Sequence, residues 1–320
     1  MRVGIVGLGL IGRQRLDALS RLQATNKDLV IVGCVDPYQE NVPHRYGTVD
    51  ELLDEKLDLL FVAVPHREIH GICQTALKRG VRVHVEKPLG TSLEESRNLA
   101  LLDANGKMLT VGFNYRFFHG VLELLADIRQ RRFGDLIRID FVIGHGGSPA
   151  DLESWKLDPV AAGGGSLLDP GIHLLDLVLL ITDKPRISYL HNWKGFWNTG
   201  IDEESTVLLT SDTVPLITVT SSIVRWRSEF AIKVVGKDGY GYVQGRGRSY
   251  GPQRYIRGER WGWSSHVSQE ESETLVSEDN CEDSFEIEIQ QLLKPNDNYP
   301  MPCTSAEALQ VMELLFKILS

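Results

Sequence analysis

Three side chains in this sequence have the types needed to move a proton and stabilise a negative charge at an alcohol carbon: Lys87, Asp169 and His173. Histidine titrates near neutral pH and commonly accepts the proton when an alcohol is oxidised. A lysine ammonium group can polarise a carbonyl oxygen or stabilise a developing alkoxide. Asp169 and His173 are four residues apart, so we expect them, with Asp176, on one face of a helix predicted over about 166–181.

Each of these side chains also has a purely structural interpretation. Asp169 can cap a helix whose first residue is Pro170. His173 can be a hydrogen-bonded core residue, and Lys87 can be an ordinary surface lysine at a strand end. All three structural interpretations would have to hold together, in a chain with the loop described next, so the chemical interpretation is favoured.

A glycine-rich loop lies near the N-terminus, with the sequence Gly7-Leu8-Gly9-Leu10-Ile11-Gly12. A GxGxxG motif alone is a weak signal, but between a strand and a helix it is typical of dinucleotide binding. We expect Gly7 to make the tight turn, Gly9 to let the backbone approach a pyrophosphate, and Gly12 to let the helix pack close to the strand. The helix N-terminus would supply free N–H groups for the phosphates.

A carboxylate ends the next predicted strand. Asp36 lies 24 residues after Gly12, and it can accept hydrogen bonds from the adenosine ribose hydroxyls. A carboxylate there repels a 2′-phosphate, and Pro37 and Tyr38 bring no arginine beside it, so we predict NAD as the cofactor. Arg13, just past the loop, keeps NADP open as an alternative. The structural interpretation is that the carboxylate only caps a strand end.

The elements that must position these residues alternate over the first 118 residues. Short apolar, β-branched runs predict strands at 2–6, 29–35, 59–64, 81–85 and 108–113. Segments that are polar on one side predict helices between them, at about 49–55, 67–79 and 92–105. Strands that are apolar on both faces and alternate with helices indicate a parallel sheet covered on both sides. The predicted fold of residues 1–118 is therefore a doubly wound α/β, or Rossmann, domain.

The alternation ends near residue 118, and strands in series follow. The predicted elements are helices at about 119–130, 166–181, 284–293 and 305–319, and strands at about 136–144, 205–210, 216–224 and 229–235. Thr304 and Glu307 form a capping-box pattern at the start of the last helix. The Gly-rich run 236–251 is typical of mobile loops. Strands in series with helices set apart predict an α+β domain, 119–320, with a large, mostly antiparallel sheet.

Composition excludes several functional classes. The 320 residues are 42% hydrophobic and include 34 Lys or Arg against 43 Asp or Glu, for a net charge of -9. This balance argues against a general nucleic-acid binder or a polybasic membrane-surface protein. No stretch of the sequence reaches the roughly 18 to 20 apolar residues that a membrane span needs. Four scattered cysteines without a CxxC pair favour reduced thiols in a cytoplasmic protein.

Two further motifs carry a family resemblance. Glu86-Lys87-Pro88 ends the fourth predicted strand, and residues 163–176 read Gly-Gly-Gly-Ser-Leu-Leu-Asp-Pro-Gly-Ile-His-Leu-Leu-Asp. With the N-terminal glycine loop, these motifs resemble the glucose–fructose oxidoreductase, inositol dehydrogenase and MocA family over essentially the whole chain. The run Gly112-Phe113-Asn114-Tyr115-Arg116-Phe117 and the pair Trp155-Lys156 belong to the same resemblance. Pro170 departs from it, because relatives more often carry a branched or aromatic residue there.

The resemblance implies a role for each site residue. Lys87 would contact the substrate and the nicotinamide ribose, His173 would be the general base or acid, and Asp169 would position the substrate hydroxyl. Hydride would move to or from C4 of the nicotinamide, and the Lys87–Pro88 peptide would be cis. The implied cofactor-binding residues are Gly7, Gly9, Leu10, Ile11, Gly12, Asp36, Val64, Pro65, His70, Glu86, Lys87 and Asn114. The implied substrate-binding residues are Lys87, Tyr115, Trp155, Lys156, Asp169 and His173.

Two other features have competing interpretations. His66 and His70 are spaced as two metal ligands can be, but no Cys or carboxylate cluster accompanies them, so we predict no metal site. His70 is expected to support the cofactor or simply to pack. Residues 225–260 hold nine Lys or Arg against three acids, with aromatics between them. This stretch can bind an anionic substrate, or it can form a solvated sheet face or a subunit interface, and the second interpretation is favoured.

These observations predict a cytoplasmic NAD-dependent oxidoreductase, with NADP as the open alternative. It would interconvert a secondary alcohol and a ketone on a sugar, cyclitol or sugar derivative. One alternative is an enzyme of a nucleotide-linked sugar, and another is a non-catalytic NAD-sensing regulator. Lys87, Asp169 and His173 together favour an enzyme, because a pure binding module needs no base. We expect no nucleic-acid or membrane partner, and the resemblance implies a homodimer or homotetramer.

Overall fold

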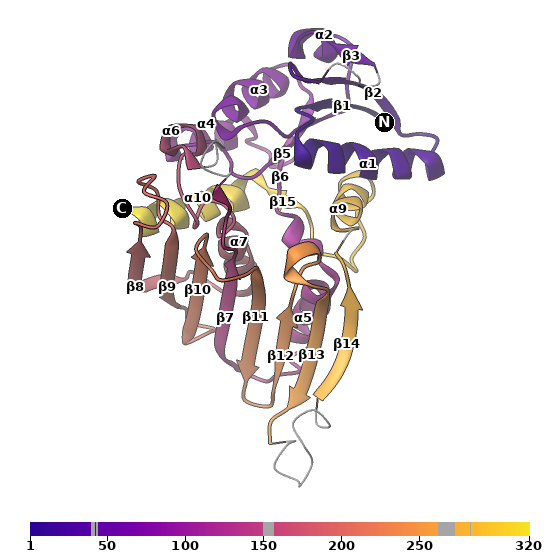
Figure 1. The fold of residues 1–320 in the computed structure, drawn as a ribbon. Coiled ribbons are helices and arrows are strands. Elements are labelled where there is room, and N and C mark those ends of the chain that lie inside the picture. The colour runs from indigo at the N-terminus through magenta and orange to yellow at the C-terminus, as the bar shows by residue number, and fades with distance from the viewer. Residues whose placement is uncertain (40–41, 43, 150–156, 262–272, 282) are drawn as a thin grey trace. The chain divides into compact units, whose positions relative to one another are not determined.

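The chain forms two compact units that are not contiguous in sequence. The computed structural model describes residues 1–320 except 40–41, 43, 150–156, 262–272 and 282 (Figure 1). The first unit contains Met1–Asn114, Ala161–Gly163 and Phe285–Phe316, and the second contains Tyr115–Val160, Gly164–Ser284 and Lys317–Ser320. The expected domains, 1–118 and 119–320, are contiguous, and they differ from these units mainly in Phe285–Phe316, which belongs to the first unit.

Sheet A organises the first unit. Among the described residues it has seven strands in the order β15-β6-β5-β4-β1-β2-β3. Their bounds are β1 (Arg2–Val6), β2 (Val30–Val35), β3 (Arg45–Tyr46), β4 (Leu59–Val62), β5 (Arg82–Glu86), β6 (Leu109–Gly112) and β15 (Cys303–Thr304). Strands β1 to β6 pair in parallel, and β15 pairs antiparallel with β6. This strand order is that of a Rossmann domain, so the predicted fold of this half is confirmed.

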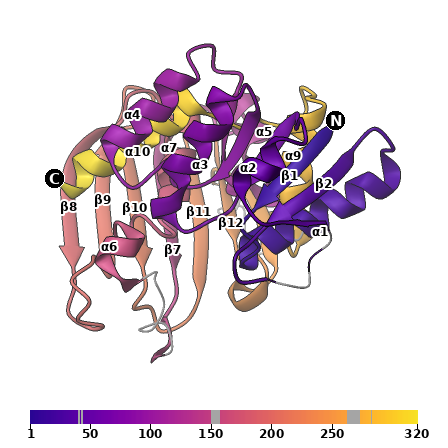
Figure 2. The ribbon, with the colours of Figure 1, turned by 90° about the horizontal axis from the view of Figure 1, so that it is seen from above.

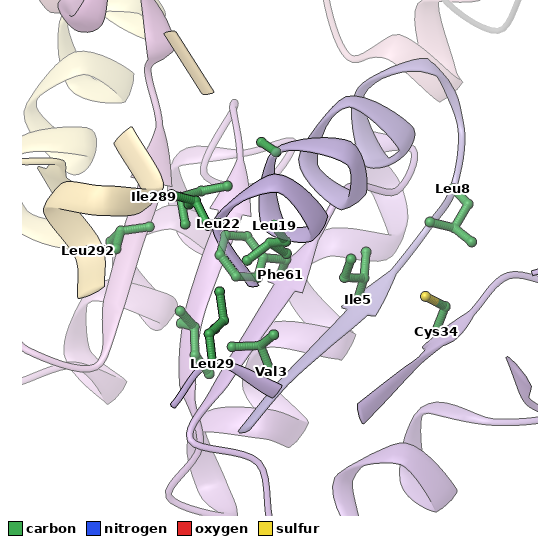
Figure 3. Packing of buried hydrophobic residues seen from close by; sticks show 12 residues of the cluster. Val3, Ile5, Leu8, Leu19, Leu22, Leu29, Cys34, Phe61, Ile289 and Leu292 are labelled. Carbon is green, nitrogen blue, oxygen red and sulfur yellow. The ribbon is translucent and has the colours of Figure 1, made fainter. Parts of the chain in front are cut away.

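Helices join sheet A to form the core of the first unit. They are α1 (Leu10–Thr25), α2 (Val49–Leu53), α3 (His66–Lys78), α4 (Leu93–Leu102), α9 (Ser284–Leu293) and α10 (Ser305–Leu319). Figure 3 shows apolar side chains of β1, α1 and α9 in one buried cluster, which includes Val3, Ile5, Leu19 and Ile289. Burial of each such side chain stabilises the fold by roughly 1.5–3 kcal/mol, so α9 is part of this unit's core although it is distant in sequence.

The predicted capping box at the last helix is confirmed. Glu307 Oε2 accepts a hydrogen bond from Thr304 N at 2.8 Å, and Thr304 Oγ1 accepts one from Glu307 N at 3.2 Å. The bounds predicted for the two C-terminal helices, 284–293 and 305–319, agree with those of α9 and α10. Within the part of the chain that the structure describes, no helix is long and apolar enough to cross a membrane.

Sheet B organises the second unit (Figures 1 and 2). The described part of the chain gives it eight strands in the order β14-β13-β12-β11-β7-β10-β9-β8. Their bounds are β7 (Leu136–Gly144), β8 (Arg186–Trp193), β9 (Glu204–Thr210), β10 (Leu216–Ser222), β11 (Glu229–Gly236), β12 (Gly239–Gln244), β13 (Gln253–Glu259) and β14 (Glu273–Asp279). Only the β7–β10 pair is parallel among these described strands, which confirms a mostly antiparallel sheet.

Short helices complete the second unit. They are η1 (Asn114–Phe117), α5 (His119–Arg129), α6 (Pro159–Ala162), α7 (Ile172–Ile181) and η4 (Arg248–Tyr250), of which η1 and α6 lie across the boundary between the units. Helix α5 packs against β12, β13 and β14, and α7 packs against β7.

The prediction of mobile loops over 236–251 is wrong for β12 (Gly239–Gln244), which is a strand inside the sheet. A Cβ atom on Gly241 would lie 2.8 Å from a side-chain carbon of Leu124 and 2.9 Å from one of Phe133. Glycine is present there because α5 packs close to the strand, and the sequence pattern could not distinguish this cause from flexibility.

Candidate active site

The residues expected to bind the cofactor follow neighbouring strands of sheet A. Asp36 follows β2, Gly7 follows β1, Val64 lies two residues after β4, Lys87 follows β5, and Asn114 lies two residues after β6. These strands are neighbours in that order. Because adjacent strands lie about 4.7–4.9 Å apart, the five positions extend about 19 Å along one edge of the sheet. Open α/β sheets bind ligands at this carboxyl edge, so the fold brings the expected cofactor residues into one line.

The glycine loop between β1 and α1 has the geometry that a phosphate needs. Gly7 has a φ of 87°, and a Cβ atom on Gly12 would lie 1.9 Å from the Gly7 carbonyl oxygen, so only glycine fits at either position. A Cβ atom on Gly9 would meet nothing within 4 Å. Gly9 caps α1 without a side-chain hydrogen bond. The first amides of α1, at Leu10 and Ile11, therefore follow a residue that has no side chain to cover them.

Asp36 is tied to this loop. Its side chain is 7% exposed. Oδ2 accepts a hydrogen bond from Leu8 N at 2.6 Å, and Oδ1 accepts one from Tyr38 N at 2.8 Å. Each carboxylate oxygen has a second lone pair, so these bonds hold the loop and still leave acceptor capacity for a ribose hydroxyl. Arg13 lies on the same side, because its guanidinium donates to the Leu8 carbonyl oxygen at 3.1 Å and to Gln39 Oε1.

A buried charge cluster holds the strand end that carries Lys87. The Lys87 side chain itself is half-buried. The Lys87–Pro88 peptide is cis, as the resemblance implied. The guanidinium of Arg15, 1% exposed, donates to Glu86 Oε1 at 2.7 Å and lies 2.6 Å from Glu288 Oε2. Burial lowers the pKa of Arg15, but Glu288 and Glu86 outweigh burial and raise it above its ordinary value. Glu86, the neighbour of Lys87, is thus fixed to α1 and α9.

Sequence reasoning missed Arg15 and Glu288. The available signal was the periodicity of α1, because Gly12, Arg15 and Leu19 fall on the buried face of this helix. A cation inside an apolar stripe needs a partner, but nothing in the sequence indicated that the partner lies on α9.

The two histidines after β4 have separate partners. His66 Nδ1 lies 2.8 Å from the Ala162 carbonyl oxygen, and His70 Nε2 lies 3.0 Å from Asn98 Oδ1 on α4. The second contact is the packing that the sequence left as one alternative for His70. Pro65, expected to bind the cofactor, is the N-cap of α3. The described residues contain no group of three or more His, Cys, Asp or Glu side chains that could hold a metal ion.

The second unit brings Tyr115, Asp169 and His173 together. The rings of Tyr115 and His173 stack with their centroids 3.9 Å apart and an angle of 7° between their planes. Both side chains are nearly buried, at 4% and 5% exposure. Burial raises the pKa of Tyr115 well above its ordinary value, and the nearby Asp169 charge adds to the increase. The phenol therefore stays protonated and can donate a hydrogen bond. Trp155 and Lys156 lie outside the described residues.

The helix that carries His173 begins later than predicted. Helix α7 starts at Ile172, with Gly171 as its N-cap, and residues 166–171 form turns. Asp169 therefore precedes the helix, and the prediction that it shares a helical face with His173 is wrong. The alternative that Asp169 caps a helix starting at Pro170 is also wrong, and the Asp169–Pro170 peptide is cis. His173 and Asp176 do lie within α7.

The carboxylate of Asp202 holds these turns, which explains the late start of the helix. It accepts hydrogen bonds from Gly165 N at 3.0 Å, Leu167 N at 2.9 Å, and the hydroxyls of Ser166 and Ser205 at 3.1 and 3.0 Å. The segment before Asp169 therefore folds around this carboxylate instead of continuing as a helix. Asp202 is a positioning residue that the sequence analysis missed, since no motif marks it.

An ion pair joins the segments that carry Tyr115 and His173. Arg116 Nε donates to Asp176 Oδ2 at 2.8 Å, and Nη2 donates to Oδ1 at 2.6 Å. Both side chains are almost fully buried. This bidentate pair fixes η1 to α7, one residue from Tyr115 and three from His173. Asp176 therefore positions the cluster through Arg116.

The basic stretch 225–260 is divided among several environments. Five of its nine bases have acidic or carbonyl partners: Arg225 (Glu204, Glu229), Lys237 (Asp135), Arg254 (Glu278), Arg257 (Asp127) and Arg260 (the Gly236 carbonyl oxygen). Three others, Arg227, Lys233 and Arg248, are exposed. Arg246 alone of the nine lies against Tyr115, its Cζ atom 5.4 Å from the ring centroid.

The fold and the edge of sheet A define a Rossmann-type NAD-binding protein with an α+β second unit. A family model described as an oxidoreductase family with an NAD-binding Rossmann fold matches residues 1–113, and the model of that family's C-terminal domain matches residues 121–241. The chain belongs to the glucose–fructose oxidoreductase, inositol dehydrogenase and MocA family of oxidoreductases.

Several relatives are dehydrogenases. Trans-1,2-dihydrobenzene-1,2-diol dehydrogenase of Xenopus tropicalis is 28% identical over 218 residues, which are 64% of this chain and 64% of the relative. Glucose-6-phosphate 3-dehydrogenase of Bacillus subtilis is 30% identical over 225 residues, which are 65% of this chain and 61% of that protein. The matches span less than two thirds of the length of these relatives.

A solved structure resembles the whole chain. Levoglucosan dehydrogenase in complex with NADH and L-sorbose superposes with a TM-score of 0.84, covering 100% of this chain and 96% of that one. The sequence identity is 14%, so this likeness shows the fold alone.

Proposed function

We propose that the protein is an NAD-dependent dehydrogenase or reductase of a secondary alcohol on a sugar, cyclitol or related polyol, with NADP as the alternative cofactor. One observation carries the proposal: a buried imidazole, His173, lies flat against a buried tyrosine with a carboxylate nearby, in a chain whose other unit has a dinucleotide-binding edge. The names of the relatives, dehydrogenases of a diol and of a sugar phosphate, support the same reaction class.

The residues of sheet A fit a nicotinamide dinucleotide. The uncapped N-terminus of α1 and the open space beside Gly9 would take the pyrophosphate, and Asp36 would bind the adenosine ribose. Val64, His70 and Asn114 would line the nicotinamide side of the same edge. When bound, the cofactor supplies the acceptor or donor of hydride at C4 of its nicotinamide.

The side chains of the protein would move the proton. In the direction of oxidation, His173 accepts the proton of the substrate hydroxyl on a ring nitrogen, and in reduction it returns that proton to the carbonyl oxygen. The stacked ring of Tyr115 keeps the imidazole in one orientation, and Asp169 holds the hydroxyl. Lys87, at the end of β5, has the ammonium group that would stabilise a developing alkoxide, the role that the family resemblance implies.

Screening for turnover tests this proposal. Purified protein is mixed with NAD or NADP and a panel of hexoses, inositols, diols, sugar phosphates and nucleotide sugars, and the absorbance of reduced nicotinamide is followed. We expect oxidation of at least one secondary alcohol, with loss of activity in Lys87→Ala. The regulator alternative is favoured instead if NAD binds tightly, no substrate of the panel reacts, and Lys87→Ala leaves NAD binding unchanged.

We also propose that the protein acts as a homodimer or homotetramer in the cytoplasm. Support for self-association comes from sheet B, because its inner strands β9, β10 and β12 alternate buried residues with partly exposed ones. Light scattering of the purified protein measures the mass, and a monomer at micromolar concentration would contradict the oligomer.

A further inference from the structure

The loop after β12 presents one arginine to the candidate catalytic cluster. We infer that Arg246 binds an anionic group of the substrate, a phosphate or a carboxylate, so that the substrate is an acidic sugar derivative and not a neutral sugar. The inference rests on the proposed function and adds the charge of the substrate to it.

Arg246 shares an aromatic neighbour with His173. Its Cζ atom lies 5.4 Å from the Tyr115 ring centroid, and the His173 ring centroid lies 3.9 Å from the same point. The guanidinium carbon and the imidazole are therefore separated by no more than the sum of these distances. One hexose ring with an exocyclic phosphate or carboxylate can bridge such a separation, with its hydroxyl at His173 and its anion at Arg246.

The guanidinium of Arg246 hydrogen-bonds with the Tyr250 side chain but keeps further hydrogen-bonding capacity. It forms no ion pair with any described residue, whereas Arg254 and Arg257 on the neighbouring strand β13 do. Its Nε atom is buried and makes no hydrogen bond within the described part of the chain. Buried donors in native proteins almost always have a partner, which a ligand oxygen or an ordered water can supply. The planar fork of N–H groups matches phosphate and carboxylate oxygens.

The loop that carries Arg246 is held in place. Gly247, with a φ of 79°, donates its N–H to the Gly251 carbonyl oxygen at 2.7 Å, and a Cβ atom there would lie 2.2 Å from the Asn280 carbonyl oxygen. Gln253 donates to the Gly245 carbonyl oxygen at 3.2 Å. The ring of Tyr250 lies 4.0 Å below the guanidinium. The arginine is thus oriented before a ligand binds, which reduces the entropy that binding costs.

The same buried side chain, Gln253, connects this loop to the helix that follows Tyr115. Its Oε1 atom accepts a hydrogen bond from Gly120 N, in the first turn of α5, at 2.7 Å. A structural role for Arg246, as a cation stacked between Tyr115 and Tyr250, is the competing interpretation. It predicts that kcat/KM does not depend on the charge of the substrate, so measuring that dependence separates the two interpretations.

Matched substrates test the inference. The ratio kcat/KM is measured for a hexose, its monophosphate and its uronic acid, with wild type, Arg246→Ala, Arg246→Lys and the control Arg248→Ala, an exposed arginine of the same loop. We expect wild type to prefer one anionic member at least about tenfold, Arg246→Ala to lose that preference, and Arg246→Lys to restore part of it, because a charged hydrogen bond is worth a tenfold change or more. The preferred member, phosphate or uronic acid, identifies the anion.

Inorganic phosphate gives a second readout that needs no turnover. We expect millimolar phosphate to raise the thermal midpoint of the NADH-bound wild type and of Arg248→Ala, but not of Arg246→Ala, at constant ionic strength. The inference is overturned if wild type does not discriminate between neutral and anionic substrates, or if Arg246→Ala lowers kcat/KM equally for both. If no substrate reacts, the proposed function fails, and the phosphate measurement alone decides whether Arg246 binds an anion.

Discussion

The carboxyl edge of sheet A and the Tyr115–His173 cluster of the second unit are built in different ways. The edge presents backbone groups and single side chains at the ends of neighbouring parallel strands, so topology alone brings Gly7 and Lys87 into one line. The cluster depends on side-chain contacts between separate segments, namely the Arg116–Asp176 ion pair and the Asp202 carboxylate. The comparison indicates that changes at the edge should alter cofactor affinity, and changes in the cluster should alter turnover or folding.

Substitution of His173, the proposed base, should give the largest effect, a loss of activity. We expect His173→Ala to lower kcat by about a thousandfold, because positioned general bases contribute roughly 10²–10⁴-fold. The dissociation constant of NADH, measured by fluorescence titration, should change less than about threefold, since His173 lies in the second unit. His173→Asn is the matched variant that preserves most of the packing against Tyr115. Retention of most activity in either variant contradicts the role of the imidazole.

Breaking the buried Arg116–Asp176 ion pair of the second unit should give the next largest effect, a loss of stability. Asp176→Asn leaves the Arg116 guanidinium buried against a neutral partner, and we expect the free energy of unfolding to fall by about 3 kcal/mol. Asp212→Asn is the control, because Asp212 pairs with Arg186 at an exposed site, where water screens the pair and it contributes little to stability. Urea unfolding measures the free energy of unfolding of both variants. Similar small decreases in the two would show that the buried pair does not hold η1 to α7.

Substitutions at the edge of sheet A should change the preference between NAD and NADP and leave the hydride-transfer step unaffected. We expect Asp36→Ala to weaken NAD about tenfold more than NADP, because the ribose hydroxyls lose an acceptor and the 2′-phosphate loses a repelling charge. Both affinities will also fall together, since the bond from Leu8 N is lost. Arg13→Ala should weaken NADP alone. Isothermal titration with both cofactors gives the ratio, and an unchanged ratio in Asp36→Ala refutes the ribose assignment.

The smallest expected effect is on the pH dependence of stability, to which one histidine in each unit contributes with opposite sign. Burial, with the Arg15 charge, lowers the pKa of His84 well below 6.5, so the unfolded chain binds a proton that the folded chain does not. This costs stability as the pH falls below about 6.5, by up to about 1.4 kcal/mol per pH unit. The pKa of His119 is raised, because its pair with Asp283 outweighs partial burial, so its contribution is present below 6.5 and is lost as the pH rises.

Two variants check this prediction. Urea unfolding is followed between pH 5 and pH 8 in His84→Gln and His119→Gln. We expect His84→Gln to flatten the acid side of the stability profile, and His119→Gln to remove a small gain on the same side. Identical profiles in wild type and His84→Gln would mean that this histidine is not kept neutral by burial.

Local patterns were sufficient to predict much of the fold. The strand over Arg2–Val6 and the helices over 284–293 and 305–319 agree with their predicted bounds, because their apolar spacing and caps are local signals. The strand-loop-helix context also predicted the glycine loop. Sequence did not separate β12 from a loop, because a glycine required by the packing of α5 looks the same as a flexible one.

The parts of the site that depend on distant contacts could not be predicted. Helical spacing placed Asp169 beside His173 on one face, but Asp202 captures the amides of Gly165 and Leu167, and its effect on the start of α7 has no local pattern. Arg246 was one of nine basic residues in its stretch, and only the folded chain shows that it contacts Tyr115. Residue type and motif therefore indicated the fold and the family, whereas the contacts that position the side chains had no local signal.

We propose that the chain transfers hydride between a sugar-like alcohol and a nicotinamide. Deuterium labelling tests this transfer: the best substrate of the panel is prepared with deuterium on the reacting carbinol carbon, and the products of the wild-type reaction are analysed by NMR. We expect the label at C4 of the reduced nicotinamide. Release of the label into water, or its retention in the product, would contradict hydride transfer.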